Sequence, residues 1–243
     1  MYDPLVSRTL ASNQAPSNAY WHTTTETLNF PSLNDQLRSD VVIIGGGYTG
    51  LSCAIHLAKQ GVDNIIVLEA NDIGWGCSGR NAGFVLPGSG RLGYQQLVSR
   101  FGKEQTLALH HDYMQAIELV SQLACEAKAD IDACEPGYLK LAHSAKWYDK
   151  LRSTAEYLQE EFNYEVSAID RASFCQDYVD HRKVYGAIRY TNGFGINPLK
   201  LVNAYANYAK SLGVKIYCQS SVIDIESSAQ HRVTTEGGQI TAD

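Results

Sequence analysis

The feature that most constrains this chain is a strand, glycine turn, helix and strand pattern over residues 41–70. The stretch reads VVIIGGGYTGLSCAIHLAKQGVDNIIVLEA. Residues 40–45 form a short β-branched run that ends at glycine, which is typical of a buried parallel strand. Apolar residues then recur at helical spacing over residues 51–58, and Gly61 stands where a C-terminal cap belongs. Residues 64–70 predict a second buried strand, and a right-handed crossover would place both strands side by side in one parallel sheet.

Three glycines in the turn, Gly45, Gly47 and Gly50, have the G-x-G-x-x-G spacing of a dinucleotide site. Gly45 permits the tight turn, Gly47 lets the backbone approach a pyrophosphate, and Gly50 lets the helix pack against the strand. The helix N-terminus adds free N–H groups and a partial positive charge for a phosphate. A glycine turn without a ligand is the alternative interpretation. The flanking strands, the helix and its cap favour the nucleotide site instead.

A carboxylate, Glu69, ends the second predicted strand. In a dinucleotide site, a carboxylate at this place accepts hydrogen bonds from ribose hydroxyls and repels a 2′-phosphate, so NADP is disfavoured. The fingerprint alone does not separate FAD from NAD.

The glycine-rich connection over residues 71–93 favours the longer cofactor. So long a loop in a compact domain is usually functional. An NAD domain usually passes from its second strand straight into another helix–strand unit. Here the run GCSGRNAG intervenes, with many backbone N–H groups and the side chains of Ser78, Arg80 and Asn81. We expect this loop to reach a second phosphate and a flavin ring, although Arg80 can also be read as a solvated loop arginine.

Composition excludes several classes of partner. The chain has 243 residues, of which 44% are hydrophobic and 19% charged, so a sizeable core is expected. The net charge of −6 and the lack of a Lys/Arg stripe argue against nucleic acid. No apolar run approaches the ~20 residues of a membrane span, and no secretory signal is apparent, so we expect a cytoplasmic protein. Six cysteines without C-x-x-C spacing are interpreted as buried small residues, and no metal site is expected.

The rest of the chain alternates between helical and extended patterns. An arm over residues 1–38 is rich in Ser, Thr, Asn and Pro and is expected to have little structure of its own. The other expected elements are a helix from about 103 to 129, a strand at 137–144, a helix through 147–158, a strand at 184–194, a helix at 198–213, and a strand at 214–221 followed by a short meander.

Four stretches also carry a family resemblance: YW at 20–21, DVVIIGGGYTGLSCAIHLAKQG, VLEANDIGWGCSGRNAGFVLPG, and INPLKLVNAYANYAKSLGVKIYCQSSVIDI. They resemble the FAD-dependent D-amino-acid oxidase-like superfamily, and within it the amine oxidases of the gamma-glutamylputrescine oxidoreductase type. The IGWGCSGRN run is similar to the GASGRN loop of that group. The resemblance implies an α/β fold in which a Rossmann-type FAD-binding parallel sheet is interleaved with an α+β substrate domain. It also implies oxidation of an amine or amino acid to an imine.

The resemblance implies residue roles as well. Gly45, Gly47 and Gly50 would contact the pyrophosphate and Glu69 the adenosine ribose. The loop residues Ser78, Arg80 and Asn81 would lie near the pyrophosphate and the flavin edge. Val222 would bind adenine through its backbone. Some relatives attach flavin to a histidine where this chain has Arg80, which implies non-covalent FAD here. No catalytic residue is assigned.

The resemblance divides the chain into four segments: an arm (1–38), a first FAD-binding segment (39–93), a helical substrate-domain segment (94–195) and an incomplete second FAD-binding segment (196–243). Because family members are longer, we expect an N-terminal fragment whose C-terminal part is missing. Such a fragment would be inactive alone, hold FAD weakly and self-associate through an unpaired strand edge. The alternatives are an NAD-dependent dehydrogenase and a non-catalytic nucleotide-binding module.

Overall fold

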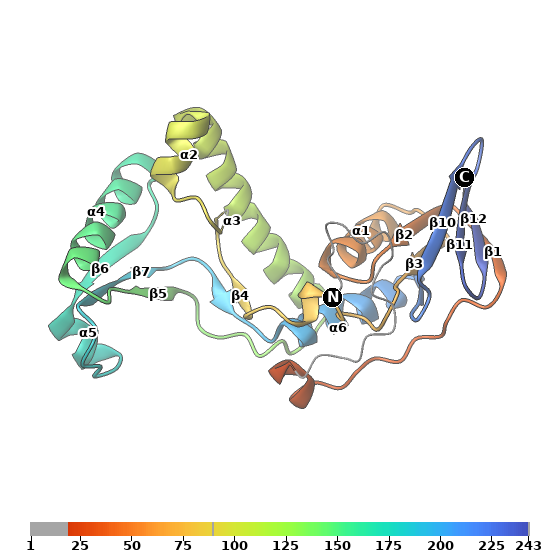
Figure 1. Ribbon diagram of the computed structural model, residues 1–243, viewed down its shortest axis with the longest axis horizontal. Coiled ribbons are helices and arrows are strands. Elements are labelled where there is room, and N and C mark those ends of the chain that lie inside the picture. Colours follow the sequence, from red (N-terminus) through yellow and green to blue (C-terminus); the bar gives the residue numbers. More distant parts are fainter. Residues whose placement is uncertain (1–18, 89, 243) are drawn as a thin grey trace. The chain divides into compact units, whose positions relative to one another are not determined.

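A computed structural model describes residues 19–88 and 90–242 (Figure 1). The chain divides into two compact units. The first unit comprises residues up to Gly83, Leu123–Asp132 and Asn197–Asp243. The second comprises Phe84–Gln122 and Ala133–Ile196. The chain therefore leaves the first unit twice and returns to it twice. The four-segment division predicted above stays a prediction.

The first unit contains the parallel sheet predicted from residues 41–70. Its order is β2 (Val41–Ile44), β3 (Ile65–Leu68) and β9 (Lys215–Tyr217), all parallel. Helix α1 (Tyr48–Lys59) connects β2 to β3 and buries an apolar face against the unit, while all four residues of β3 are buried. The α1 cap also forms as predicted, because Gly61 adopts a φ of +86° and its N–H bonds to the carbonyl of Ala58.

A second sheet of the first unit has the order β1 (Gln36–Ser39), β12 (Gln239–Ala242), β11 (His231–Thr235) and β10 (Val222–Ser227). Strands β10, β11 and β12 form an antiparallel meander, as predicted. Strand β1 runs parallel to β12, with Gln36 opposite Gln239.

The described part of the predicted arm is irregular over residues 26–34 but contains two short elements that were not predicted. That part contains a 3-10 helix, η1 (Tyr20–Thr23), and strand β1. Residues 1–18 lie outside the described residues. Strand β1 has no recognisable local pattern, because its partner strand comes from the other end of the chain and Leu37 is its only apolar residue.

Helix α6 (Pro198–Ser211) completes the first unit and has the capping that its sequence predicts. The side chain of Asn197 accepts a hydrogen bond from Lys200 N, and Pro198 occupies the first turn. Nine of its residues are buried, and it lies against α1. Both helices therefore hold the glycine turn and the loop that follows β3.

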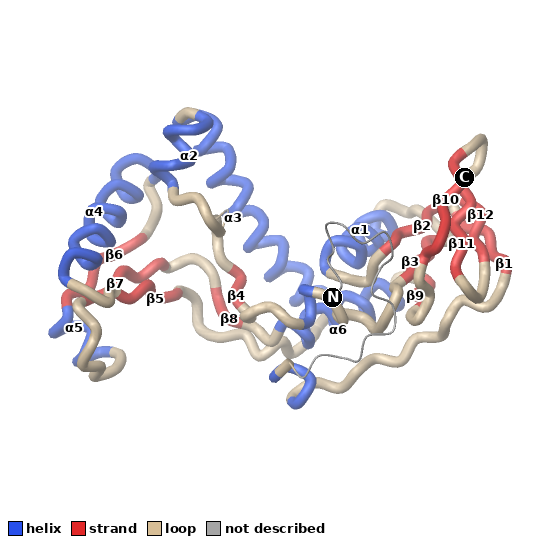
Figure 2. The backbone as a smooth tube through the Cα atoms, in the orientation of Figure 1, coloured by secondary structure: helices blue, strands red, loops and turns tan. Residues whose placement is uncertain are grey.

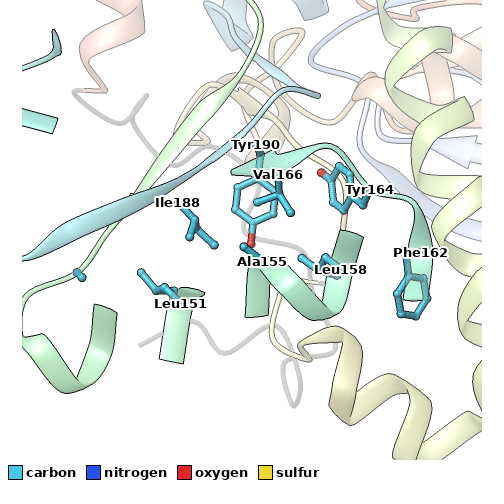
Figure 3. Packing of buried hydrophobic residues seen from close by; sticks show 9 residues of the cluster. Leu151, Ala155, Leu158, Phe162, Tyr164, Val166, Ile188 and Tyr190 are labelled. Carbon is cyan, nitrogen blue, oxygen red and sulfur yellow. The ribbon is translucent and has the colours of Figure 1, made fainter. Parts of the chain in front are cut away.

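The second unit is an antiparallel sheet covered by a helix. The sheet order is β5 (Tyr138–Leu141), β7 (Gly186–Tyr190) and β6 (Val166–Asp170). Helix α4 (Ala145–Phe162) turns Leu151, Ala155 and Leu158 toward this sheet, as Figure 3 shows. This apolar face has the spacing expected from the sequence.

The remaining elements are shorter or less periodic, and Figure 2 shows their types along the chain. They are η2 (Cys77–Gly79), β4 (Phe84–Val85), α2 (Tyr94–Phe101), α3 (Lys103–Glu126), α5 (Arg171–Asp177) and β8 (Phe194–Gly195). Strand β4 pairs antiparallel with β8. Helix α3 covers the helical stretch expected at 103–129. No helix among the described residues is both long and apolar enough to span a membrane.

Candidate dinucleotide-binding site

The turn between β2 and α1 is as tight as its glycine spacing predicts. Gly45 adopts a φ of +108°, and its N–H donates to the carbonyl of Leu68 at 2.7 Å. A Cβ on Gly50 would lie 2.0 Å from the Gly45 carbonyl oxygen. Only glycine at position 50 therefore allows α1 to approach the end of β2 this closely.

The N-terminus of α1 faces the 71–83 loop. Ser78 Oγ accepts a hydrogen bond from Tyr48 N at 3.0 Å, and a Cβ on Gly47 would lie 2.9 Å from the same oxygen. The N–H groups of Gly47, Thr49 and Gly50 have no partner within residues 19–88 and 90–242. Free N–H groups at a helix N-terminus are the donors that a phosphate requires.

The carboxylate of Glu69 lies at this turn. Its Oε2 accepts from Gly46 N at 2.7 Å, and its Oε1 accepts from Asn71 N at 2.9 Å. A carboxylate has about four lone-pair sites, so roughly two remain for ribose hydroxyls. The Glu69 backbone is fixed as well, since its N–H donates to Tyr217 O and its carbonyl accepts from Ser220 N.

The loop after β3 is tightly folded. A Cβ on Gly79 would lie 2.1 Å from the Gly74 carbonyl oxygen. The Asn81 side chain closes the turn, because its Nδ2 donates to the carbonyls of Cys77 and Ser78 and its Oδ1 accepts from Gly83 N. Ser78 and Asn81 therefore belong to one hydrogen-bonded loop beside the helix N-terminus.

Arg80 lies on the exposed side of this loop. Its guanidinium carbon is 4.6 Å from the centre of the Trp75 ring, and its Nε donates to Gly76 O at 3.3 Å. The structure thus brings Ser78 and Asn81 to the helix terminus and stacks Arg80 on Trp75. The predicted cofactor contact of Arg80 stays a prediction.

Val222 begins β10, half-buried against an apolar cluster that includes Ile66 and Val233. Ser220, two residues earlier, donates its N–H to the Glu69 carbonyl at 2.9 Å. The start of β10 is therefore linked to the residue assigned to the ribose. The register of β10 shifts between Val222 and Asp224. The predicted adenine contact stays a prediction.

Sequence reasoning missed Trp21 and Tyr48. Trp21 Nε1 donates to the Asn81 carbonyl at 2.9 Å. Burial raises the pKa of Tyr48 to about 12, so its hydroxyl stays protonated and donates to Pro198 O at 2.8 Å. Both contacts join distant parts of the chain, so no local spacing could predict them. In the sequence, the YW pair at 20–21 is marked only by the family resemblance.

The interpretation of the cysteines as buried was wrong for most of them. Cys53, Cys77, Cys125 and Cys134 are exposed, Cys175 is half-buried, and Cys218 is buried. The exposed cysteines lie on helix surfaces and in loops, where a small side chain is accessible to solvent. No group of three or more His, Cys, Asp or Glu residues within the described part of the chain could hold a metal ion.

These features fit the adenosine diphosphate part of a dinucleotide. The turn offers unpaired N–H groups beside open space at Gly45, and Glu69 offers acceptors close by. Phosphate and ribose need donors and acceptors in this arrangement.

The fold and this site are those of a dinucleotide-binding α/β protein, and comparison with known proteins assigns the family. The model of the FAD-dependent oxidoreductase family DAO matches residues 40–243. The chain belongs to this family, whose members depend on FAD.

Two curated relatives have similar sequences. Gamma-glutamylputrescine oxidoreductase of Escherichia coli (strain K12) is 31% identical over 213 residues, 88% of this chain and 49% of the relative. The probable oxidoreductase OrdL of Rhizobium meliloti (strain 1021) is 32% identical over 216 residues, which are 88% of this chain and 50% of that relative. The chain thus spans about half the length of these relatives.

Two solved structures share the fold. Glycine oxidase from Geobacillus kaustophilus matches with a TM-score of 0.68 at 24% identity, over 85% of this chain and 54% of that one. L-Amino acid deaminase from Proteus myxofaciens matches with a TM-score of 0.68 at 22% identity, over 94% of this chain and 48% of that one. The fold predicted from the sequence is therefore confirmed.

Proposed function

We propose that this chain forms the FAD-binding part of an enzyme that oxidises an amine or amino acid to an imine. The observation that carries the proposal is the family match over residues 40–243, which includes every residue assigned to the nucleotide. Three of the proteins named above carry names that refer to amino compounds, namely gamma-glutamylputrescine, glycine and L-amino acids, which supports this substrate class. Gamma-glutamylputrescine is the first candidate substrate, from the sequence relative that bears its name.

The residues of this chain would bind and orient the cofactor. Donors at Gly47, Thr49 and Gly50 would hold the pyrophosphate, and Glu69 would hold the ribose. The flavin, when bound, supplies the acceptor for a hydride from the carbon that bears the nitrogen. Amine, rather than ammonium, is the form that can lose this hydride readily, so turnover should rise with pH as the substrate deprotonates.

Non-covalent binding is part of the proposal. The family resemblance implies that Arg80 stands where some relatives carry the histidine that attaches flavin, and a guanidinium stays charged at any pH that proteins tolerate. It has no free lone pair for such a bond. Denaturation should therefore release the FAD into solution, and a flavin that stays with the precipitated protein would contradict this point.

The loop after β3 supports FAD over NAD. Instead of entering a helix–strand unit, the chain folds back so that Ser78 meets the N-terminus of α1. Such a loop adds contacts beside the pyrophosphate, where a flavin would begin.

The test uses the purified full-length protein. Its visible spectrum should show the bands of oxidised flavin, and anaerobic addition of a substrate amine should bleach them. A panel of polyamines, gamma-glutamyl-polyamines and amino acids would identify the substrate. A colourless protein that binds NAD would contradict the assignment of FAD as the cofactor. A yellow protein whose flavin no amine or amino acid bleaches would contradict the proposed oxidation reaction.

A further inference from the structure

A chain of hydrogen bonds joins the N-terminal helix η1 to the N-terminus of α1. It starts at Trp21, whose half-buried indole donates to the Asn81 carbonyl at 2.9 Å across 60 positions of sequence. The Asn81 side chain donates to the carbonyl of Ser78 at 3.1 Å. Ser78 Oγ in turn accepts from Tyr48 N at 3.0 Å. The last bond reaches the helix terminus assigned to the pyrophosphate.

The segment around Trp21 is itself fastened to α6. Asn197 Nδ2 donates to the hydroxyls of Thr24 and Thr25, both at 3.1 Å. Asn203 Nδ2 donates to the carbonyl of Glu26 at 2.9 Å. Both asparagines are buried. Residues 20–26, called the strap below, are thus held at one end by α6 and at the other by the loop.

The 76–83 loop needs such support. It contains three glycines, which lose more conformational freedom on ordering than other residues. A loop that is already ordered in the apoprotein binds the cofactor more tightly, because less conformational entropy is lost on binding. A hydrogen bond to the Asn81 carbonyl fixes the residue whose side chain closes the loop.

We propose that Trp21 is a cofactor-positioning residue, and that the strap holds the 76–83 loop in the conformation that places Ser78 on the N-terminus of α1. This inference rests on the proposed FAD function. Trp21 acts through Asn81 and Ser78 and needs no contact with the cofactor.

The first test is Trp21→Phe in the full-length protein, which keeps an aromatic ring and removes the indole N–H. The FAD dissociation constant of the apoprotein should rise about fivefold, the equivalent of one ordinary hydrogen bond. Trp147→Phe is the matched control, since Trp147 packs against the apolar cluster of the second unit, and its FAD affinity should not change.

A double-mutant cycle tests the route from Trp21 to α1. If Trp21 acts through Ser78, the losses of FAD affinity in Trp21→Phe and Ser78→Ala should not add in the double variant. Full additivity would overturn the route. Should Trp21→Phe fold poorly, Thr24→Val with Thr25→Val loosens the other end of the strap and should also weaken FAD binding.

Hydrogen exchange of the apoprotein separates this inference from the proposed function. Amides of residues 76–83 should exchange faster in Trp21→Phe than in the wild type, and at equal rates in Trp147→Phe. Faster exchange supports the strap even if the wild-type protein binds no FAD, a result that would overturn the proposed function. Unchanged loop exchange together with an unchanged FAD dissociation constant would overturn the strap.

Discussion

At the scale of single residues, Glu69 is the carboxylate on which the predicted ribose contact depends. Its two oxygens accept from Gly46 N and Asn71 N, which fixes the glycine turn, and the same carboxylate is the proposed acceptor for the ribose hydroxyls. A substitution therefore removes both turn contacts and cofactor contacts.

Glu69→Ala should weaken FAD binding at least tenfold, because charged hydrogen bonds to ribose contribute about 1.5–3 kcal/mol each. It should also lower the free energy of unfolding, since Gly46 N and Asn71 N lose their acceptors. Titration of apoprotein with FAD measures the first effect and urea unfolding the second. Glu226→Ala is the control, because Glu226 is exposed and its carboxylate pairs with Arg232 across β10 and β11. An unchanged FAD affinity in Glu69→Ala would refute the ribose assignment.

Arg80 tests whether the exposed side of the loop serves the cofactor. Arg80→Ala should lower flavin occupancy or turnover without unfolding the protein, because a cation near a phosphate or a flavin stabilises negative charge. Arg100→Ala is a matched control, since Arg100 also lies over an aromatic ring, Phe101, on α2. Normal kinetics, flavin content and melting temperature in Arg80→Ala would show that Arg80 only stacks on Trp75.

The cysteines differ in reactivity because they differ in burial. Burial raises the pKa of Cys218 from 9.0 to about 12, so at pH 8 this thiol is neutral, and only a thiolate is nucleophilic. Iodoacetamide at pH 8 should label the exposed Cys77 and Cys134 and leave Cys218 unmodified in the folded protein. Peptide mass spectrometry measures this labelling directly, and labelling of Cys218 as fast as Cys77 would contradict the prediction.

The raised pKa of Cys218 also makes stability depend on pH. Between pH 9 and 12 the Cys218 thiol ionises in the unfolded protein but not in the folded one, so Cys218 lowers the free energy of unfolding as pH rises.

At the scale of elements, the contact between β2 and α1 depends on Gly50. In Gly50→Ala the new Cβ would meet the Gly45 carbonyl oxygen at 2.0 Å, so strand and helix must separate. We expect the free energy of unfolding to fall by about 1–3 kcal/mol and FAD affinity to fall with it. Gly93→Ala is the control, because a Cβ added to Gly93 would lie 3.9 Å from its nearest neighbour, Gln96 Oε1. Equal stability of the two variants, measured by thermal unfolding, would contradict the tight turn.

Elements with a strong local period were predictable, and those fixed by distant partners were not. The β2–α1–β3 unit and α6 carry apolar spacing, caps and glycines within a few residues of one another, so their sequences specify them. Strand β1 pairs with β12 from the far end of the chain, and helix α5 is a short segment capped by Asp170. The same distinction holds in the site: Gly45, Gly50 and Glu69 follow from spacing, whereas the bond from Trp21 to Asn81 exists only after folding.

At the scale of the whole molecule, the family match over residues 40–243 includes every residue that we assign to the nucleotide. The chain spans about half the length of its curated relatives. Strand β2 pairs only with β3 among the described residues, and Ile44 at its end is 50% exposed. An apolar edge of this kind invites another strand, and self-association of residues 1–243 alone stays a prediction.

The most direct test of the account is an anaerobic titration of the full-length protein with gamma-glutamylputrescine and related amines, followed by flavin absorbance. We predict that the purified protein is yellow, that denaturation releases its FAD, and that at least one amine bleaches the oxidised bands at a rate matching turnover. A protein that retains no flavin, or whose flavin no amine or amino acid reduces, would contradict the central claim.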